Sequence, residues 1–382
     1  MGLIKTLTGQ FAKIKVIGIG GGGNNAVNSM ISEEGIKGVD FVAVNTDSQA
    51  LLNSLAPIKI QIGEKITKGL GAGGDPNIGQ QAAEESRDRI KEVLEGTDML
   101  FITGGMGGGT CTGAAPIIAE IAKKELNILT IAVVTKPFLF EGTRRMSKAD
   151  EGLSRLRQHV DTLIVIPNQR VIEVVNSQAT LLEAFKIADS VLTKGTKAIA
   201  DLITTPGLIN LDFADIKSIM NNAGSALMGV GEAEGDNKAQ HAVEAAIDSP
   251  LVEVNIDGAR GVLINITGGP DLTMSEIEES AKTITAHVAP DANVIFGASV
   301  DPDLEGKIKI TVIATGFETN KNSAYSSYKK PLSLQKPLIE TDSETPKEID
   351  PQLQNLMADQ EIPAGIDIED EFDIPAFLRK NG

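Results

Sequence analysis

Apolar and polar positions follow two different rhythms along the first half of the chain. Five segments are near-continuous apolar runs of strand length, typical of parallel strands buried on both faces. Segments with helical spacing lie between them, such as residues 114–126 and 148–160. This alternation predicts a doubly wound α/β domain with a mostly parallel sheet. The predicted strands cover residues 13–20, 38–45, 98–103, 129–135 and 161–167.

Helical spacing continues from Thr180 to Ile203 and stops at the sequence TTPG, so we expect one long central helix. A smaller mixed α/β domain is predicted to follow. In it, DFADIKSIMNNAGSALMG, KAQHAVEAAIDSP and MSEIEESAKTITAHV have helical spacing, whereas ARGVLINITG, NVIFGASV and KIKITVIATG resemble strands. The expected boundaries are 13–178 for the first domain, 179–205 for the connecting helix and 206–316 for the second domain.

The last part of the chain has a different composition. Residues 317–367 are rich in Ser, Lys, Glu, Asp and Pro and show little periodicity, which predicts a disordered linker. Apolar residues return in residues 368–382, among them Phe372, Ile374 and Phe377. Apolar residues at the end of a disordered tail favour a short peptide that docks on partners. A frayed terminus is the alternative.

Composition and charge narrow the classes of function. Hydrophobic residues make up 41% of the 382 residues, enough for a sizeable core. The formal net charge of −17 argues against DNA or RNA as the main partner, because binding a phosphate backbone needs basic clusters. An acidic protein can still bind a nucleotide through backbone N–H groups and a metal ion. The single cysteine, Cys111, excludes an intramolecular disulfide.

A first glycine loop follows the first predicted strand and opens a helix. Gly18, Gly20 and Gly23 have the spacing G-x-G-x-x-G, and the loop continues into Asn24 and Asn25. Without Cβ atoms the backbone can approach a phosphate closely, and the free N–H groups of the next helix face the anion. The loop alone fits a dinucleotide site equally well. In that alternative Asp47, after the second strand, would bind a ribose hydroxyl.

A second strand, glycine loop and helix follow at residues 98–116, where GGMGGGTCTG precedes the helix. Two such loops that converge on one site suit a longer polyphosphate, and Thr110 and Thr112 add hydroxyl groups. A P-loop is excluded, because neither loop ends in Gly-Lys-Ser/Thr. Tight packing of strand against helix is the structural alternative for such glycines.

With both loops in view, the chain resembles the tubulin/FtsZ family of GTPases, and within it the bacterial cell-division proteins. The second loop, Gly107 to Gly113, is similar to the family signature G-G-G-T-G-T-G. Cys111 stands where the family has glycine, and it would be strained if that position required a positive φ. The resemblance covers about residues 13–316 and the terminal peptide.

The resemblance implies a GTP site, with Mg²⁺ held mainly by the phosphates and water and no dedicated protein metal site. It places Glu141 and Arg145 near the ribose and phosphates, and Asn25, Asn168, Phe185 and Asp189 near the base. An Asp that accepts from the guanine N1–H would select guanine. The residues expected in the phosphate loops are Gly21, Gly22, Gly23, Asn24, Asn25, Gly107, Gly108, Gly109, Thr110, Cys111, Thr112 and Gly113.

An acidic segment opens the second domain. From the residues alone, Asp212 is a plausible N-cap and Asp215 a first-turn acid, which predicts structure without chemistry. The resemblance implies that Asn210, Asp212 and Asp215 enter the nucleotide site of the next subunit and complete it for hydrolysis of GTP to GDP and phosphate. Activity should then rise with assembly. A head-to-tail contact that does not close gives an open filament.

The resemblance also implies a place in the cell. The peptide Asp373–Arg379 is similar to the one that membrane-anchoring division proteins such as FtsA and ZipA bind. With no apolar leader and no run of 18 apolar residues, we expect a cytoplasmic protein without direct membrane insertion. The resemblance implies that it is located at the mid-cell division site. Two other functions stay open at this stage: a dinucleotide-dependent oxidoreductase built on the first loop, and a filament protein that does not hydrolyse its nucleotide.

Overall fold

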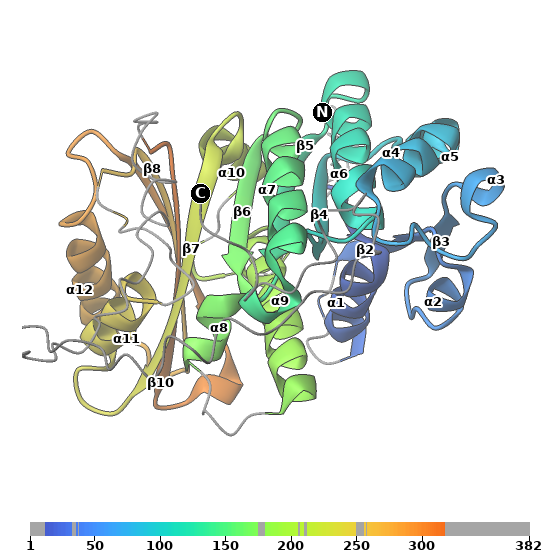
Figure 1. The fold of residues 1–382 in the computed structure, drawn as a ribbon. Helices are drawn as coiled ribbons and strands as arrows, with labels where there is room; N and C mark the ends of the chain where they lie inside the picture. Colours follow the sequence, from blue (N-terminus) through green and yellow to red (C-terminus); the bar gives the residue numbers. More distant parts are fainter. Residues whose placement is uncertain are drawn as a thin grey trace, which may run out of the picture. The chain divides into compact units, whose positions relative to one another are not determined.

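The computed structural model describes residues 12–32, 36, 38–174, 180–204, 207–209, 212–249, 256 and 258–317. The predicted docking peptide, Asn210 and all of the predicted linker except Phe317 lie outside these residues. Figure 1 shows the described elements. The strands are β1 (Ile14–Ile19), β2 (Val39–Asn45), β3 (Ile58–Gln61), β4 (Met99–Gly105), β5 (Leu129–Lys136), β6 (Thr162–Pro167), β7 (Gly224–Glu234), β8 (Gly261–Gly268), β9 (Asn293–Val300) and β10 (Lys307–Thr315). The α-helices are α1 (Gly20–Ser32), α2 (Ser48–Leu52), α3 (Glu64–Thr67), α4 (Pro76–Glu85), α5 (Arg87–Leu94), α6 (Thr110–Glu120), α7 (Thr143–Arg157), α8 (Asn168–Val174), α9 (Leu181–Thr204), α10 (Phe213–Met220), α11 (Lys238–Ile247) and α12 (Met274–Thr285).

In the described part of the chain, the ten strands form one sheet in the order β3-β2-β1-β4-β5-β6-β7-β10-β8-β9. Every neighbouring pair from β3 to β7 is parallel. β10 is antiparallel to β7 and β8, and β8 is parallel to β9. β1 and β4 are buried along almost their whole length, as the continuous apolar runs predict. The predicted mostly parallel α/β architecture is confirmed.

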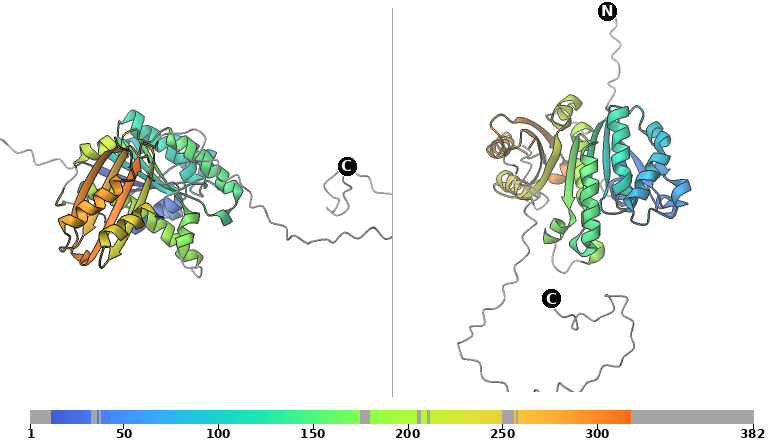
Figure 2. Two further views of the ribbon diagram at one scale, coloured as in Figure 1. Left: turned by 90° about the vertical axis from the view of Figure 1, so that its left-hand side faces the viewer. Right: turned by 45° about the horizontal axis from the view of Figure 1, so that its top comes forward.

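Helices cover both faces of the parallel strands. On one face, α1 and α9 pack on alternate strand residues such as Val16 and Val133. On the other face, α5, α6 and α7 pack on the residues between, such as Ile17 and Val134. α11 and α12 lie side by side against the β8–β10 part of the sheet, where the yellow and orange helices appear together in Figure 2.

The long helix α9 runs from the carboxyl ends of the parallel strands to their amino ends. Near its start, the ring of Phe185 contacts that of Phe138, which follows β5, at a centroid distance of 5.3 Å. At its end, Thr204 lies against Gly38, which precedes β2; a Cβ on Gly38 would be 3.0 Å from Thr204 Cγ2. Its 24 residues span about 36 Å. α9 therefore connects the carboxyl edge of the strands to their amino edge.

Two predictions of secondary structure were incomplete or wrong. The helix predicted over residues 212–229 ends at Met220, because the backbone turns left-handed at Asn222 (φ 52°) and Gly224 (φ 74°). The rest is strand β7, whose buried residues alternate at Ala226 and Met228. The short edge strand β3 was not predicted, because its sequence IKIQ alternates over only four residues.

β7 joins the two parts of the sheet. Its first residues pair with β6, and the remainder pairs with β10. The domain boundaries at residues 178, 205 and 316 stay predictions. Among the described residues, no helix has both the length and the apolarity needed to cross a bilayer.

Candidate functional site

Four segments leave the sheet at the same edge. β1, β4, β5 and β6 are parallel neighbours, so the chain that follows each strand begins at their common carboxyl edge. These segments are the two predicted glycine loops, the loop that contains Phe138 and Glu141, and Asn168 at the start of α8. Ligands of open α/β sheets bind at this edge. The topology thus brings the predicted site together.

The glycines of the first loop have two different roles. A Cβ on Gly18 would lie 2.3 Å from the carbonyl oxygen of Gly23, and one on Gly23 would lie 2.6 Å from that of Thr103. These two glycines let strand and helix pack closely. Gly21 has no atom within 4 Å of its missing Cβ, and for Gly22 the nearest is 3.6 Å away. Packing alone does not require glycine at positions 21 and 22, and both are exposed at the start of α1.

Asn24 and Asn25 point to different surroundings. Asn24 is buried, and its amide nitrogen donates to the carbonyl oxygens of Gly18 (3.0 Å) and Gly20 (3.1 Å), while its oxygen accepts from Asn45 Nδ2 (3.1 Å). It holds the shape of the loop. Asn25 is exposed on the same turn. Of the two, Asn25 is therefore the side chain available to a ligand.

The second loop repeats this division. A Cβ on Gly113 would lie 2.0 Å from the carbonyl oxygen of Pro76, so Gly113 is required for packing against α4. Gly108 has no atom within 4 Å of its missing Cβ. Gly107 takes a positive φ of 95°, and its N–H donates to the buried hydroxyl of Thr112 (2.8 Å). Thr110 begins α6, whose free N–H groups lie beside the open glycine.

A third glycine loop, not predicted from the sequence, completes this edge. Residues 69–75 read GLGAGGD and precede α4, which Asp75 caps through Asn77 N–H (2.9 Å). Gly71, Gly73 and Gly74 have positive φ, and the last two have open space beside them. A Cβ on Gly109 would meet Ala72 Cβ at 2.8 Å, so the second and third loops are in contact. Four glycines in six residues were the available signal, missed because no long apolar strand precedes them.

Cys111 is accommodated without backbone strain. It is the second residue of α6 and does not belong to the described residues with positive φ. Its side chain is buried, with Sγ 3.9 Å from Met106 Sδ. Burial raises the pKa of the thiol to about 12. The residue that departs from the family signature is therefore packed in the core, and the burial of its thiol disfavours a role as nucleophile.

The loop after β5 presents an ion pair and an aromatic cluster. Glu141 Oε2 pairs with Arg145 at 2.8 Å, and Glu141 Oε1 accepts from the N–H of Phe138 at 2.9 Å. The ring of Phe138 is buried between Phe140, which stacks on it, and Phe185. Phe185 remains 40% exposed, so core packing does not account for it. Asp189 follows one turn later on α9 and is half-buried.

Asn168 carries an unusual polar atom. Its side chain is 6% exposed, and its Oδ1 has no hydrogen-bond partner within the described part of the chain. Buried polar atoms in native proteins are almost always paired, so this oxygen is available to a donor that the described residues do not supply. Nucleobases and riboses carry such donors. The residues of this edge, with open glycines, helix N-termini and an unpaired acceptor, fit a nucleotide.

The predicted acids lie at the other edge of the sheet. Asp212 follows the end of α9 at the amino edge and caps α10. The far end of α10 is also held at that edge, where Thr162, the first residue of β6, donates its hydroxyl to the carbonyl oxygen of Met220 (2.6 Å). In Figure 1, α8 and α10 lie at opposite ends of β6. A strand of seven residues such as β4 is about 23 Å long. The structure thus does not bring Asp212 and Asp215 to the glycine loops of the same subunit.

One other expectation from the sequence concerns Asp47. Asp47, which a dinucleotide site would use for a ribose, instead caps α2 by accepting from Gln49 N–H (2.9 Å) and Ala50 N–H (3.2 Å). Within the described residues, no group of three or more His, Cys, Asp or Glu side chains is arranged to hold a metal ion.

Comparison with known proteins agrees with this geometry. A model of the GTPase domain of the tubulin/FtsZ family matches residues 13–176, and a model of the C-terminal domain of the FtsZ family matches residues 224–318. The cell division protein FtsZ of Coxiella burnetii (strain RSA 493 / Nine Mile phase I) is 55% identical over 324 residues, which are 85% of this chain and 83% of that protein.

Solved structures show the same likeness. An empty FtsZ dimer from M. jannaschii has a TM-score of 0.77 at 49% identity and covers 80% of this chain and 89% of its own. CetZ2 from Haloferax volcanii, in a GTPγS-bound protofilament, has a TM-score of 0.68 at 21% identity over 80% of this chain and 94% of its own, a likeness of fold alone. The chain belongs to the tubulin/FtsZ family, is a guanine-nucleotide-binding GTPase and is similar to the cell division protein FtsZ.

Proposed function

We propose that GTP bound at the carboxyl edge of one subunit is hydrolysed with the help of Asp212 and Asp215 from the next subunit. The observation that supports this proposal is that the glycine loops lie at one edge of the sheet and the two acids at the other. A head-to-tail stack places the amino edge of one copy on the carboxyl edge of the next. Such a contact is heterologous and repeats into a filament.

The three glycine loops would hold the phosphates. Gly21, Gly22 and Gly108 leave room for them, and the N-termini of α1 and α6 supply N–H donors and favourable dipoles. Arg145 adds a positive charge, while Glu141 orients it. Mg²⁺ bound to the phosphates and water would neutralise part of the phosphate charge. The base would lie near Phe185 and Asn168, and Asn25 and Asp189 would be the other side chains near it.

Hydrolysis then requires an oriented water molecule. The neighbour's Asp212 and Asp215 would hold this water in line with the γ-phosphorus and accept its proton as the new P–O bond forms. The bond between the γ-phosphorus and the bridging oxygen breaks, and that oxygen leaves with GDP. Because the glycine loops and the acids of one subunit lie at opposite edges of its sheet, turnover should depend on assembly. Asn210, which the resemblance adds to this segment, lies outside the described residues.

A mixing experiment tests this sharing. Asp212→Ala keeps its glycine loops, and Gly108→Val keeps its acids but fills the open space over the second loop. Each variant alone should release almost no phosphate from GTP. Mixed in equal amounts, they should recover turnover. At some contacts the intact glycine loops of an Asp212→Ala subunit lie against the intact acids of a Gly108→Val subunit. Failure to recover turnover, with both variants folded, would contradict a shared site.

The tail would connect the filament to the division apparatus. We propose that Asp373–Arg379 binds membrane-anchoring proteins such as FtsA and ZipA and thereby holds the filament at mid-cell. The acidic and apolar residues of this peptide support a docking role. A chain that ends at residue 367 should assemble and hydrolyse GTP normally in solution, yet lose binding to these partners in a pull-down and lose its mid-cell location in cells.

A further inference from the structure

α6 does not end as a regular helix. After Glu120 it widens into a π-helical turn, Ile121–Glu125, in which the N–H of Leu126 donates to the carbonyl oxygen of Ile121, five residues earlier (3.1 Å). Such a turn inserts one residue into a helix and is frequent at functional sites. Since α6 begins at the second glycine loop, this turn lies at the other end of a phosphate-loop helix, near the amino edge of the sheet.

Lys123 in this turn has three polar partners for its ammonium group. It donates to the carbonyl oxygen of Val160 (2.8 Å) and to Asn222 Oδ1 (2.9 Å), and it forms an ion pair with Asp161 Oδ1 (3.0 Å). The side chain of Asp161 is 4% exposed and that of Lys123 25%. A satisfied cation beside a buried carboxylate is a rigid contact, unlike a solvated surface pair.

These partners fix the backbone turn that follows the C-terminal end of α10, around Asn222. Asp161 Oδ1 accepts from the N–H of Asn222 (3.3 Å), and Asp161 Oδ2 accepts from the N–H of Thr130 (2.9 Å). Asn222 lies two residues after Met220, the last residue of α10. Lys123 binds the side chain of the same asparagine. The C-terminal end of α10 is thereby tied to the π-turn of α6, while its N-terminal end carries Asp212 and Asp215.

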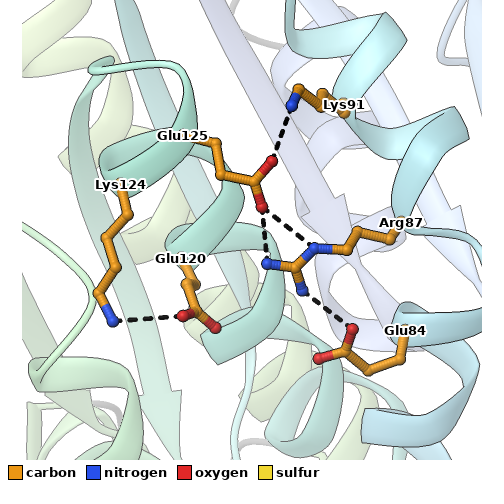
Figure 3. Close-up of polar contacts among 6 residues, drawn as sticks. All are labelled: Glu84, Arg87, Lys91, Glu120, Lys124 and Glu125. Atoms are coloured by element: carbon orange, nitrogen blue, oxygen red, sulfur yellow. Dashed lines mark hydrogen bonds and ion pairs between the residues drawn. The ribbon is translucent and has the colours of Figure 1, made fainter.

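The other side of the π-turn is anchored to α5. Figure 3 shows Glu125 between Lys91 and Arg87, with Nζ–Oε2 and Nη2–Oε1 distances of 2.8 and 2.7 Å. These cations lower the pKa of Glu125. Lys124, the residue between Lys123 and Glu125, pairs with Glu120 at 3.2 Å on α6 itself. The π-turn is thus fixed to α5 through Glu125, and through Lys123 it fixes the C-terminal end of α10.

We propose that Lys123 is a positioning residue for GTP hydrolysis, because it fixes the turn behind α10 and thereby the direction in which α10 presents Asp212 and Asp215 to the next subunit. This inference rests on the proposed sharing of the site. α10 has eight residues and is about 12 Å long, so a tilt of about 5° at its fixed end moves Asp212 by about 1 Å. Misplacement on this scale can cost up to about 100-fold in rate.

Three variants test this role. Lys123→Met should lower kcat for GTP by roughly tenfold or more, with GTP affinity and sedimentable polymer unchanged, and Lys123→Arg should restore part of the loss. Asn222→Gly removes the side-chain contact while suiting the left-handed backbone at that position, so it should lower kcat without unfolding the protein. Lys124→Met is the matched control, with turnover like that of the parent chain.

Mixing shows which half of the site Lys123 serves. Lys123→Met mixed with Gly108→Val should regain turnover, because its own loops are intact and receive well-placed acids. Mixed with Asp212→Ala it should show no gain, since both variants lack working acids. The reverse pattern, or normal kcat in Lys123→Met and Asn222→Gly, would overturn the inference. Failure of Asp212→Ala to recover with Gly108→Val would instead overturn the shared site itself.

Discussion

Asp212 and Asp215 cap each other's backbone. Asp212 Oδ1 accepts from the N–H of Asp215 at 2.8 Å, and Asp215 Oδ2 accepts from the N–H of Asp212 at 3.3 Å. This capping box uses one oxygen of each carboxylate. The acids that we assign to hydrolysis therefore also begin the helix that carries them, and the structural reading from the sequence holds alongside the catalytic proposal.

Substitution of Asp212 can separate the two roles. Serine is as good an N-cap as aspartate, so Asp212→Ser should keep the stability of the parent chain, whereas Asp212→Ala should lose about 1 kcal/mol. Both should lose GTP turnover, because neither has a carboxylate. Urea unfolding and phosphate release measure the two effects. Substantial turnover in Asp212→Ser would show that the carboxylate is dispensable.

Glycines with open space beside them should matter for nucleotide binding, whereas closely packed glycines should matter for folding. Gly108→Val should leave the unfolding midpoint nearly unchanged and abolish GTP binding, because the side chain enters space that we assign to the phosphates. Gly113→Val should instead prevent stable folding, since its Cβ would overlap the carbonyl oxygen of Pro76. Circular dichroism, thermal unfolding and nucleotide titration distinguish the two. Tight GTP binding by Gly108→Val would place the phosphates elsewhere.

Asn168→Ala should weaken nucleotide binding without weakening the fold. Its buried Oδ1 has no partner among the described residues, so its removal breaks no known internal hydrogen bond. Loss of a hydrogen bond to the ligand should raise the Kd for GTP by roughly tenfold, about 1.4 kcal/mol. Titration with GTP and GDP, together with urea unfolding, tests this. A large loss of stability with normal affinity would show that Asn168 is structural.

The thiol of Cys111 should be almost unreactive in the folded protein. Burial raises its pKa from 9.0 to about 12, so at pH 8 the thiolate fraction is about 1000-fold below that of an exposed thiol. Maleimide labelling should be correspondingly slow and become fast in urea. The unfolded chain ionises at lower pH, so Cys111 favours the folded state below pH 9 and this contribution is lost progressively toward pH 12. Rapid labelling of native protein at pH 8 would contradict the buried placement.

The predictions from the sequence agree most closely with the structure where the local spacing of apolar residues determines the secondary structure. The five apolar runs of the first half are strands β1, β2, β4, β5 and β6, and the run of helical spacing after Thr180 is α9. The prediction was wrong after Met220, where the left-handed backbone at Asn222 and Gly224 turns a helical pattern into a strand. Asparagine and glycine tolerate a left-handed backbone, but their presence in the sequence does not by itself predict one.

For the site, the sequence by itself determined the residue types: open-backbone glycines, hydroxyls and an acidic helix start in an order that resembles one GTPase family. Only the tertiary structure decided which glycines serve packing and which leave space, because that depends on atoms from other elements. It also added the third loop, through its contact with Gly109, and placed Asp212 and Gly108 at opposite edges of the sheet. Parallel strands collect their following loops at one edge, and a helix as long as α9 carries the chain to the other.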